Sequence, residues 1–261
     1  MKPADEKAVL FVDVLGFAAL VDENPLDVDD LVGLDRLSHH LASALAAHKN
    51  PLTSAFWWFH HSLKWALEMA RMSHPVTAIS FSDSAFIATD RIVQAVEIAT
   101  ELTKSLLRHG IPARTGIAHG TFAAVRFKSD ISIDSGEHAA HFLGTGVVRA
   151  HEAEKCGVRG IRILLHPSAA ALLDETAPVL ELPQHEHNSS VEVRHELDYW
   201  SFNVTDGRKA WHAIQDLWDS APDQAQVHYE STARAIDRMR VRQGFAPLKN
   251  LRRRTLPRDR A

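Results

Sequence analysis

The chain has 261 residues, and 45% of them are hydrophobic, so it can bury one substantial core. Its formal net charge of -4 is spread over mixed signs, which argues against nucleic acid as the main partner. A single cysteine, Cys156, excludes an internal disulfide and a cysteine-based zinc cluster. The polar start and the lack of a long apolar stretch predict a cytoplasmic protein with no membrane contact.

The first predicted strand, residues 9–17, is a hydrophobic run with one acid, Asp13, and a glycine turn behind it. A buried carboxylate is costly unless a cation or a donor meets it, so Asp13 is a site candidate. An acidic segment follows at 22–30, and then leucines recur at helical spacing: Leu31, Leu34, Leu37, Leu41 and Leu45. This spacing predicts a helix over one face of the sheet.

Residues 54–72 hold an aromatic cluster that includes Phe56, Trp57 and Trp58, and they are expected to form a helix. The cluster fits core packing, a dimer contact or a wall of a nucleotide pocket. Residues 76–81 and 85–89 predict a hairpin around the turn that carries Asp83. Asp90 is the expected N-cap of a helix that ends near Gly110.

Strands are then predicted at 111–117 and 162–165, an apolar run at 121–127, and helices at 144–156 and 167–173. Beyond these, residues 181–190 are a polar loop, 191–204 are strand-like, 208–218 and 227–242 are helical, and 251–260 form a basic tail. The order predicts an α+β fold of the split βαβ (ferredoxin-like) kind, an antiparallel sheet with helices on one face. We expect a domain at 1–206, with a helical insertion at about 50–74, and a C-terminal helical extension at 207–261.

Asp13 and Asp83 occupy matching breaks in two apolar strands, which favours a shared site. Two carboxylates suit Mg²⁺ or Mn²⁺, and the turn at Gly16 offers backbone N–H groups to phosphates. Taken singly, each acid also fits a turn-capping role.

These residues carry a resemblance. The run Phe11-Val12-Asp13-Val14-Leu15-Gly16-Phe17 resembles the first metal-binding signature of class III nucleotidyl cyclases, and Ser82-Asp83-Ser84 resembles their second metal-binding turn. Two weaker likenesses follow in the same order, at residues 114–120 and at the helix start 144–150. The resemblance covers about residues 9–165.

The resemblance implies a homodimer with active sites at the interface, each taking a nucleoside triphosphate and two divalent cations. Asp13, Asp83 and the Val14 carbonyl would hold the metals, and Phe11, Leu15, Gly16 and Phe17 would line the nucleotide together with Val14. The ribose 3′-oxygen would attack the α-phosphorus and release pyrophosphate.

Several positions depart from the family pattern. Ile79 and His141 fall where members specific for adenine read the base, and Val148 and Glu152 fall where the family has an Asn and a catalytic Arg. Either activity is lost, or Arg149, about one helical turn earlier, supplies the cation; we favour the second.

A short, stand-alone domain of this kind is similar to the cyclases of bacterial Pycsar antiphage defence. That likeness implies UTP conversion to cyclic UMP, which would activate a separate effector, with CTP and cyclic CMP as the alternative. A second hypothesis is a catalytically silent module that binds a nucleotide. A third is a metal site built from histidines, for which three groups are candidates: His39-His40, His60-His61 and His185 with His187.

Overall fold

A computed structural model describes residues 5–25, 50–71, 75–127, 139–186, 191–248 and 251. The predicted leucine helix within 31–45 and almost all of the basic tail lie outside the described residues, as does His187.

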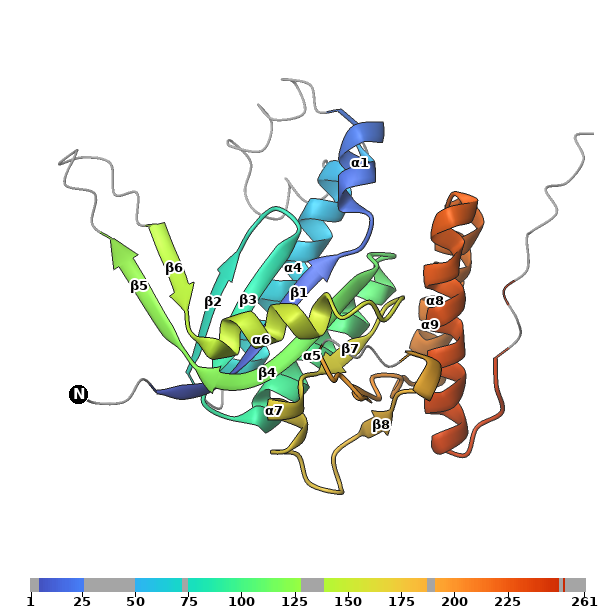
Figure 1. The fold of residues 1–261 in the computed structure, drawn as a ribbon. Coiled ribbons are helices and arrows are strands. Elements are labelled where there is room, and N and C mark those ends of the chain that lie inside the picture. Colours follow the sequence, from blue (N-terminus) through green and yellow to red (C-terminus); the bar gives the residue numbers. More distant parts are fainter. Residues whose placement is uncertain are drawn as a thin grey trace, which may run out of the picture.

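The main sheet has seven strands and is mostly antiparallel, which confirms the predicted α+β class (Figure 1). Only the pairing of β4 with β7 is parallel. Across the sheet the strands are β2 (Val76–Ser80), β3 (Ser84–Thr89), β1 (Glu6–Val14), β4 (Ala113–Thr121), β7 (Ile163–Leu165), β9 (His195–Leu197) and β8 (Val179–Glu181). A separate ribbon pairs β5 (Ala123–Phe127) with β6 (Ala139–Leu143).

The described helices match most of the predicted ones in position. They are α1 (Phe17–Glu23), α4 (Pro51–Arg71), α5 (Ile92–Arg108), α6 (Thr145–Glu154), α7 (Pro167–Ala170), α8 (Val204–Ser220) and α9 (Asp223–Arg242), with a 3₁₀ turn at Gln184–Glu186. The strand-like stretch 191–204 gives only the three residues of β9.

Helices cover both faces of the sheet, not one face as expected. Successive side chains of a strand point to opposite sides, and β1 is apolar on both. Leu10 and Val12 join the large core under α4 and α5, whereas Val9 and Phe11 join a smaller core under α6. Figure 1 shows α6 in front of β1 and β4, with α4 and α5 behind. The continuous apolar run of β1 is the physical reason for this arrangement.

The close approach of α6 to the sheet depends on Gly116 in β4. A Cβ at this position would lie 2.1 Å from the Ala150 carbonyl oxygen and 2.6 Å from the Glu154 nitrogen. The missing side chain therefore lets the end of α6 rest on β4 beside Asp13.

The C-terminal helices share the main core. Side chains of α8 and α9, among them Ile214, Ile236 and Met239, are buried in the same cluster as β1 and α5. The expected domain boundary between residues 206 and 207 falls inside α8.

The expected N-cap of α5 is wrong by one residue. Arg91 occupies the cap position and makes no side-chain cap bond. Asp90 instead pairs with Lys7, because the register that opposes Ala8 to Thr89 brings the two side chains together.

Candidate functional site

Asp13 is the penultimate residue of β1, the strand from which the site is built. It opposes Ser84 of β3 on one side and Arg114 of β4 on the other. Strand alternation places its side chain on the face of Phe11, under α6. The side chain is 20% exposed, so solvent and ligands reach the carboxylate.

Asp83 lies beside Asp13 in the fold although seventy residues separate them in the sequence. It sits in the loop between β2 and β3, where the Phe81 N–H donates to the Ser84 carbonyl oxygen at 2.7 Å. The Val14 N–H donates to the Asp83 carbonyl oxygen at 2.9 Å. The two acids therefore occupy the same end of neighbouring strands, as the sequence predicts.

The turn after β1 is fixed by its backbone. Gly16 has φ 78°, a left-handed conformation that favours glycine. The Leu15 N–H donates to the Pro112 carbonyl oxygen at 2.8 Å, and the side chains of Leu15 and Phe17 pack against the main core. The turn thus holds its exposed glycine next to the two acids.

A charge network connects Asp13 to the end of α6. Lys155 Nζ lies 2.8 Å from Asp13 Oδ2 and 3.1 Å from Glu154 Oε2. The Glu154 side chain is fully buried and accepts from Arg114 Nε at 2.8 Å. We name these four residues, Asp13, Arg114, Glu154 and Lys155, the Asp13 cluster.

Lys155 is the site residue that sequence reasoning missed. Burial alone would lower its pKa, but the hydrogen bonds and charges of Asp13 and Glu154 outweigh it, so the pKa is raised. Lys155 is therefore a firmly charged counter-ion of Asp13. No sequence signal links two residues 142 positions apart; only the fold does.

The donor set suits a hard divalent cation. Asp13 near the end of β1 and Asp83 in the loop before β3 offer carboxylate oxygens at one corner of the sheet, to which Val14 also belongs. Within the described part of the chain, no three His, Cys, Asp or Glu side chains group into a metal site. A magnesium or manganese ion here would need further oxygen ligands, which triphosphates commonly supply.

Arg149 lies away from Asp13 in the same chain. Its guanidinium donates to the His119 carbonyl oxygen at 3.0 Å, and His119 opposes Ala8 of β1. Asp13 is five positions after Ala8 on the strand, a separation of about 17 Å. Within one chain, Arg149 therefore lies too far along the sheet to contact a ligand at Asp13.

The other residues predicted to contact the nucleotide do not all lie near Asp13. Ile79 opposes Phe86 in β3, so a whole strand separates it from β1, and the exposed His141 belongs to the β5–β6 ribbon. The Phe11 side chain is 6% exposed and packs on Phe86 at 4.5 Å between ring centroids. Its side chain serves the core.

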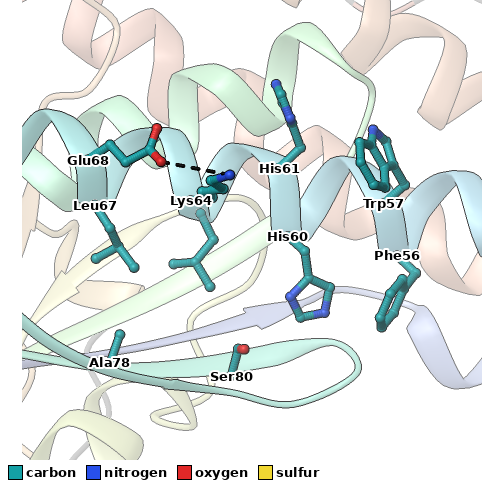
Figure 2. A pocket seen from close by; sticks show the side chains of 10 residues that line it. Phe56, Trp57, His60, His61, Lys64, Leu67, Glu68, Ala78 and Ser80 are labelled. Atoms are coloured by element: carbon teal, nitrogen blue, oxygen red, sulfur yellow. Dashed lines mark ion pairs between the residues drawn. The ribbon is translucent and has the colours of Figure 1, made fainter. Parts of the chain in front are cut away.

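A cavity of about 530 Å³ lies elsewhere, between α4 and β2 (Figure 2). Its lining includes Phe56, Trp57, His60 and Ser80. The strand residues that line it share the face of Leu10 and Val12, opposite to that of Asp13. The aromatic cluster thus packs against the sheet and lines this cavity, without contacting the Asp13 site of its own chain.

The adjacent histidines of α4 point apart. In Figure 2 His60 faces the sheet and His61 points away from it. Burial lowers the pKa of His60, and its Nε2 has no hydrogen-bond partner among the described residues. His185 lies in the 3₁₀ turn, away from both. The described residues give the histidine-metal reading no support, and His39, His40 and His187 lie outside them.

Comparisons with known proteins give the fold an independent reference. No protein-family model matches the sequence, and no curated protein matches it. Among solved structures, the guanylate cyclase domain of RhGC from Catenaria anguillulae in complex with GTP aligns with TM-score 0.52 and 13% identity. That alignment covers 75% of this chain and 97% of the other.

Two further solved structures agree. The catalytic core of a rhodopsin-guanylyl cyclase with converted specificity, in complex with ATPαS, aligns with TM-score 0.51 and 12% identity over 74% of this chain and 94% of that one. A bacterial light-regulated adenylyl cyclase aligns with TM-score 0.50 and 13% identity over 82% of this chain, which spans 57% of that protein's length. At these identities the likeness shows the fold, the class III cyclase domain fold. Separately, none of the described helices combines the length and apolarity that a bilayer crossing requires.

Proposed function

We propose that this protein is a nucleotidyl cyclase that converts UTP into 3′,5′-cyclic UMP and pyrophosphate, with CTP as the alternative substrate. The observation that carries the proposal is the placement of Asp13 and Asp83 at one corner of a cyclase-type sheet, joined by the bond from the Val14 N–H to the Asp83 carbonyl oxygen. Turn-capping roles for these acids would not require them to share a corner.

The reaction is intramolecular and balances without a side-chain nucleophile. The ribose 3′-oxygen forms a bond to the α-phosphorus, the bond from that phosphorus to the bridging oxygen breaks, and pyrophosphate leaves while the hydroxyl proton passes to solvent. Asp13, Asp83 and the Val14 carbonyl would hold two Mg²⁺ or Mn²⁺ ions, which lower the pKa of the attacking hydroxyl and neutralise the leaving phosphates. The exposed backbone N–H groups at Gly16 would donate hydrogen bonds to phosphate oxygens.

A homodimer would complete the site. One copy holds the acids, but its own Arg149 is bound to His119 some distance along β4. In an antiparallel dimer the partner copy would bring Arg149, Ile79 and His141 to the nucleotide. Ile79 cannot read a base edge by hydrogen bonding, so His141 is the polar group proposed for base contact.

The deciding experiment incubates the purified protein with Mn²⁺ and an equimolar mixture of ATP, GTP, CTP and UTP, and identifies products by mass spectrometry. We expect cyclic UMP with matching pyrophosphate, and a loss of at least about a hundredfold in Asp13→Asn, because removing a metal ligand removes several kcal/mol of transition-state stabilisation. Cyclic AMP or GMP as the sole product would overturn the pyrimidine assignment.

A silent nucleotide-binding module is the second candidate, because Val148 and Glu152 stand where the family has its Asn and catalytic Arg. No cyclic product from any triphosphate, with retained binding of Mn²⁺ and UTP, would favour it.

We further propose a role in bacterial antiphage defence, in which the cyclic nucleotide activates a separate effector protein. This part rests on the resemblance of the motifs to Pycsar cyclases. Its test is the protection of cells that carry this gene with its effector, compared with cells in which Asp13→Asn replaces the wild type.

A further inference from the structure

Lys155 is a half-exposed lysine that forms an ion pair with Asp13, the proposed metal ligand. It follows directly after α6 and reaches across to the strand end, 2.8 Å from Asp13 Oδ2. Its side chain is 48% exposed, so the ammonium group is free to move into solvent. Such a long side chain can leave Asp13 and pair with another anion when a metal ion takes its place.

We propose that Lys155 neutralises Asp13 in the metal-free protein and transfers to the triphosphate oxygens when metal and nucleotide bind together. This inference rests on the proposed function, since it takes Asp13 as a metal ligand. It assigns Lys155 as a phosphate-binding residue that makes the site favour a metal–triphosphate complex over a free metal ion.

The electrostatics support the exchange. An ammonium and a divalent cation compete for the same carboxylate, because like charges within a few ångströms of each other repel. A metal ion that binds alone must therefore displace the Lys155 ammonium group from Asp13, and the ammonium group then loses Asp13 as its counter-ion. Metal that arrives with a triphosphate brings new anionic oxygens for the lysine.

The distances support it as well. Ligand oxygens on one magnesium ion lie within about 4 Å of each other, because each is about 2.1 Å from the metal. A phosphate oxygen on an ion held by Asp13 would thus lie within reach of the long Lys155 side chain, whose Nζ is 2.8 Å from Asp13 Oδ2. Glu154, which is paired with Arg114, contacts the Lys155 ammonium nitrogen itself at 3.1 Å and so keeps the group beside Asp13.

The test measures binding rather than turnover, by isothermal titration of the full-length protein with two probes. One probe is Mn²⁺ alone, and the other is preformed manganese tripolyphosphate, which has no base or ribose. The variants are Lys155→Met, which keeps the length and removes the charge, Lys155→Arg, which keeps the charge, and Lys64→Met as a control at an exposed lysine of α4.

We expect Lys155→Met to bind free Mn²⁺ at least about threefold more tightly and manganese tripolyphosphate at least about threefold more weakly. Lys155→Arg should stay within about twofold of wild type for both probes, and so should Lys64→Met. Circular dichroism establishes that each variant is folded.

Opposite shifts support the exchange, because a general loss of stability would weaken both. Shifts in the same direction, or no shift, overturn it while leaving the metal site intact. Wild-type binding that equals that of Asp13→Asn would instead overturn the metal site and with it the proposed function.

Discussion

The same sheet carries two clusters of opposite charges, and they differ in what surrounds them. The Asp13 cluster stands at the end of β1, where a half-exposed lysine faces a carboxylate that solvent reaches. The second cluster stands at the strands β7 and β9 and is largely sealed from water. We name it the Arg162 cluster, and its members are Arg162, Glu186, Glu196 and Arg238.

The Arg162 cluster is built to stay closed. The side chains of Arg162 and Glu196 are fully buried and directly paired, and Arg238 of α9 donates to Glu196 at 3.0 Å. Nearby, the Tyr199 hydroxyl donates to the Ile161 carbonyl oxygen at 2.7 Å. The cluster has two positive and two negative side chains that are mostly buried, and the ion pairs of Arg238 attach α9 to the sheet. The comparison teaches that a solvent-exposed charge pair stays open to a ligand, whereas a buried pair can only hold the fold together.

The largest effect should come from breaking the Arg162 cluster. We expect Glu196→Gln to lower the free energy of unfolding by about 3 kcal/mol, because the fully buried Arg162 loses one of its two carboxylate partners and keeps only Glu186. Urea unfolding measures the change. The control, Glu101→Gln in the exposed pair with Lys104, should cost less than about 0.5 kcal/mol. A similar loss in both variants would contradict the structural difference between buried and exposed pairs.

A change between α6 and β4 should disturb the Asp13 cluster through packing. We expect Gly116→Ala to destabilise the protein by about 2 kcal/mol, because its Cβ meets the Ala150 and Glu154 backbone and not a flexible side chain. Thermal and urea unfolding report the loss. The matched control is Gly207→Ala within α8, where the nearest atom lies at 3.3 Å; it should change the stability by less than about 1 kcal/mol in either direction.

A smaller, pH-dependent effect belongs to neither cluster. Burial, and then the charges of Arg108 and His61, lower the pKa of His109, which stacks on Trp58 at 3.5 Å, from 6.5 to about 4. Between these values the unfolded chain holds a proton that the folded chain rejects, so stability falls as the pH drops from 6.5 towards 4.

The His109 contribution is about 1 kcal/mol at pH 5, reduced from the full shift because part of the residue is exposed to solvent. His109→Phe keeps a ring on Trp58 and should flatten the dependence of unfolding free energy on pH by that amount. Some slope should remain, because burial also lowers the pKa values of His60, His166 and His228. An unchanged slope in His109→Phe would contradict the assignment.

The smallest effect on stability should come from the Asp13 cluster itself. Lys155→Met should change the free energy of unfolding by less than about 0.5 kcal/mol, because the lysine is half exposed, water reaches Asp13, and the buried Glu154 keeps Arg114 as its partner. Urea unfolding beside Glu196→Gln gives the contrast directly. A loss near that of Glu196→Gln would mean that Lys155 is a structural clamp.

Local patterns were enough to predict much of the fold. The run around Asp13, the hairpin around Asp83 and the helices at 92–108 and 227–242 depend on apolar periodicity and turn residues within a few positions. Each of these patterns is contained within one short segment of the sequence and does not depend on the segments that pack against it. The adjacency of Asp13 and Asp83 follows from them once β1 and β3 pair.

Other features depended on contacts between distant segments. The sequence pattern placed helices on one face, whereas β1 is apolar on both sides and is covered on both. Asp90 met Lys7 across a strand pair instead of capping a helix. The short β9 was hidden in a longer strand-like run because its pairing with β7 and β8 sets its length.

The sequence by itself determined the two acids, the glycine turn and the strands that carry them, because each lies within one short segment with its own periodicity. Only the tertiary structure decided that Lys155 faces Asp13, that Arg149 points elsewhere and that a second charge cluster is sealed. Charge partners far apart in the chain leave no local pattern, and their meeting depends on how the whole sheet and its helices pack.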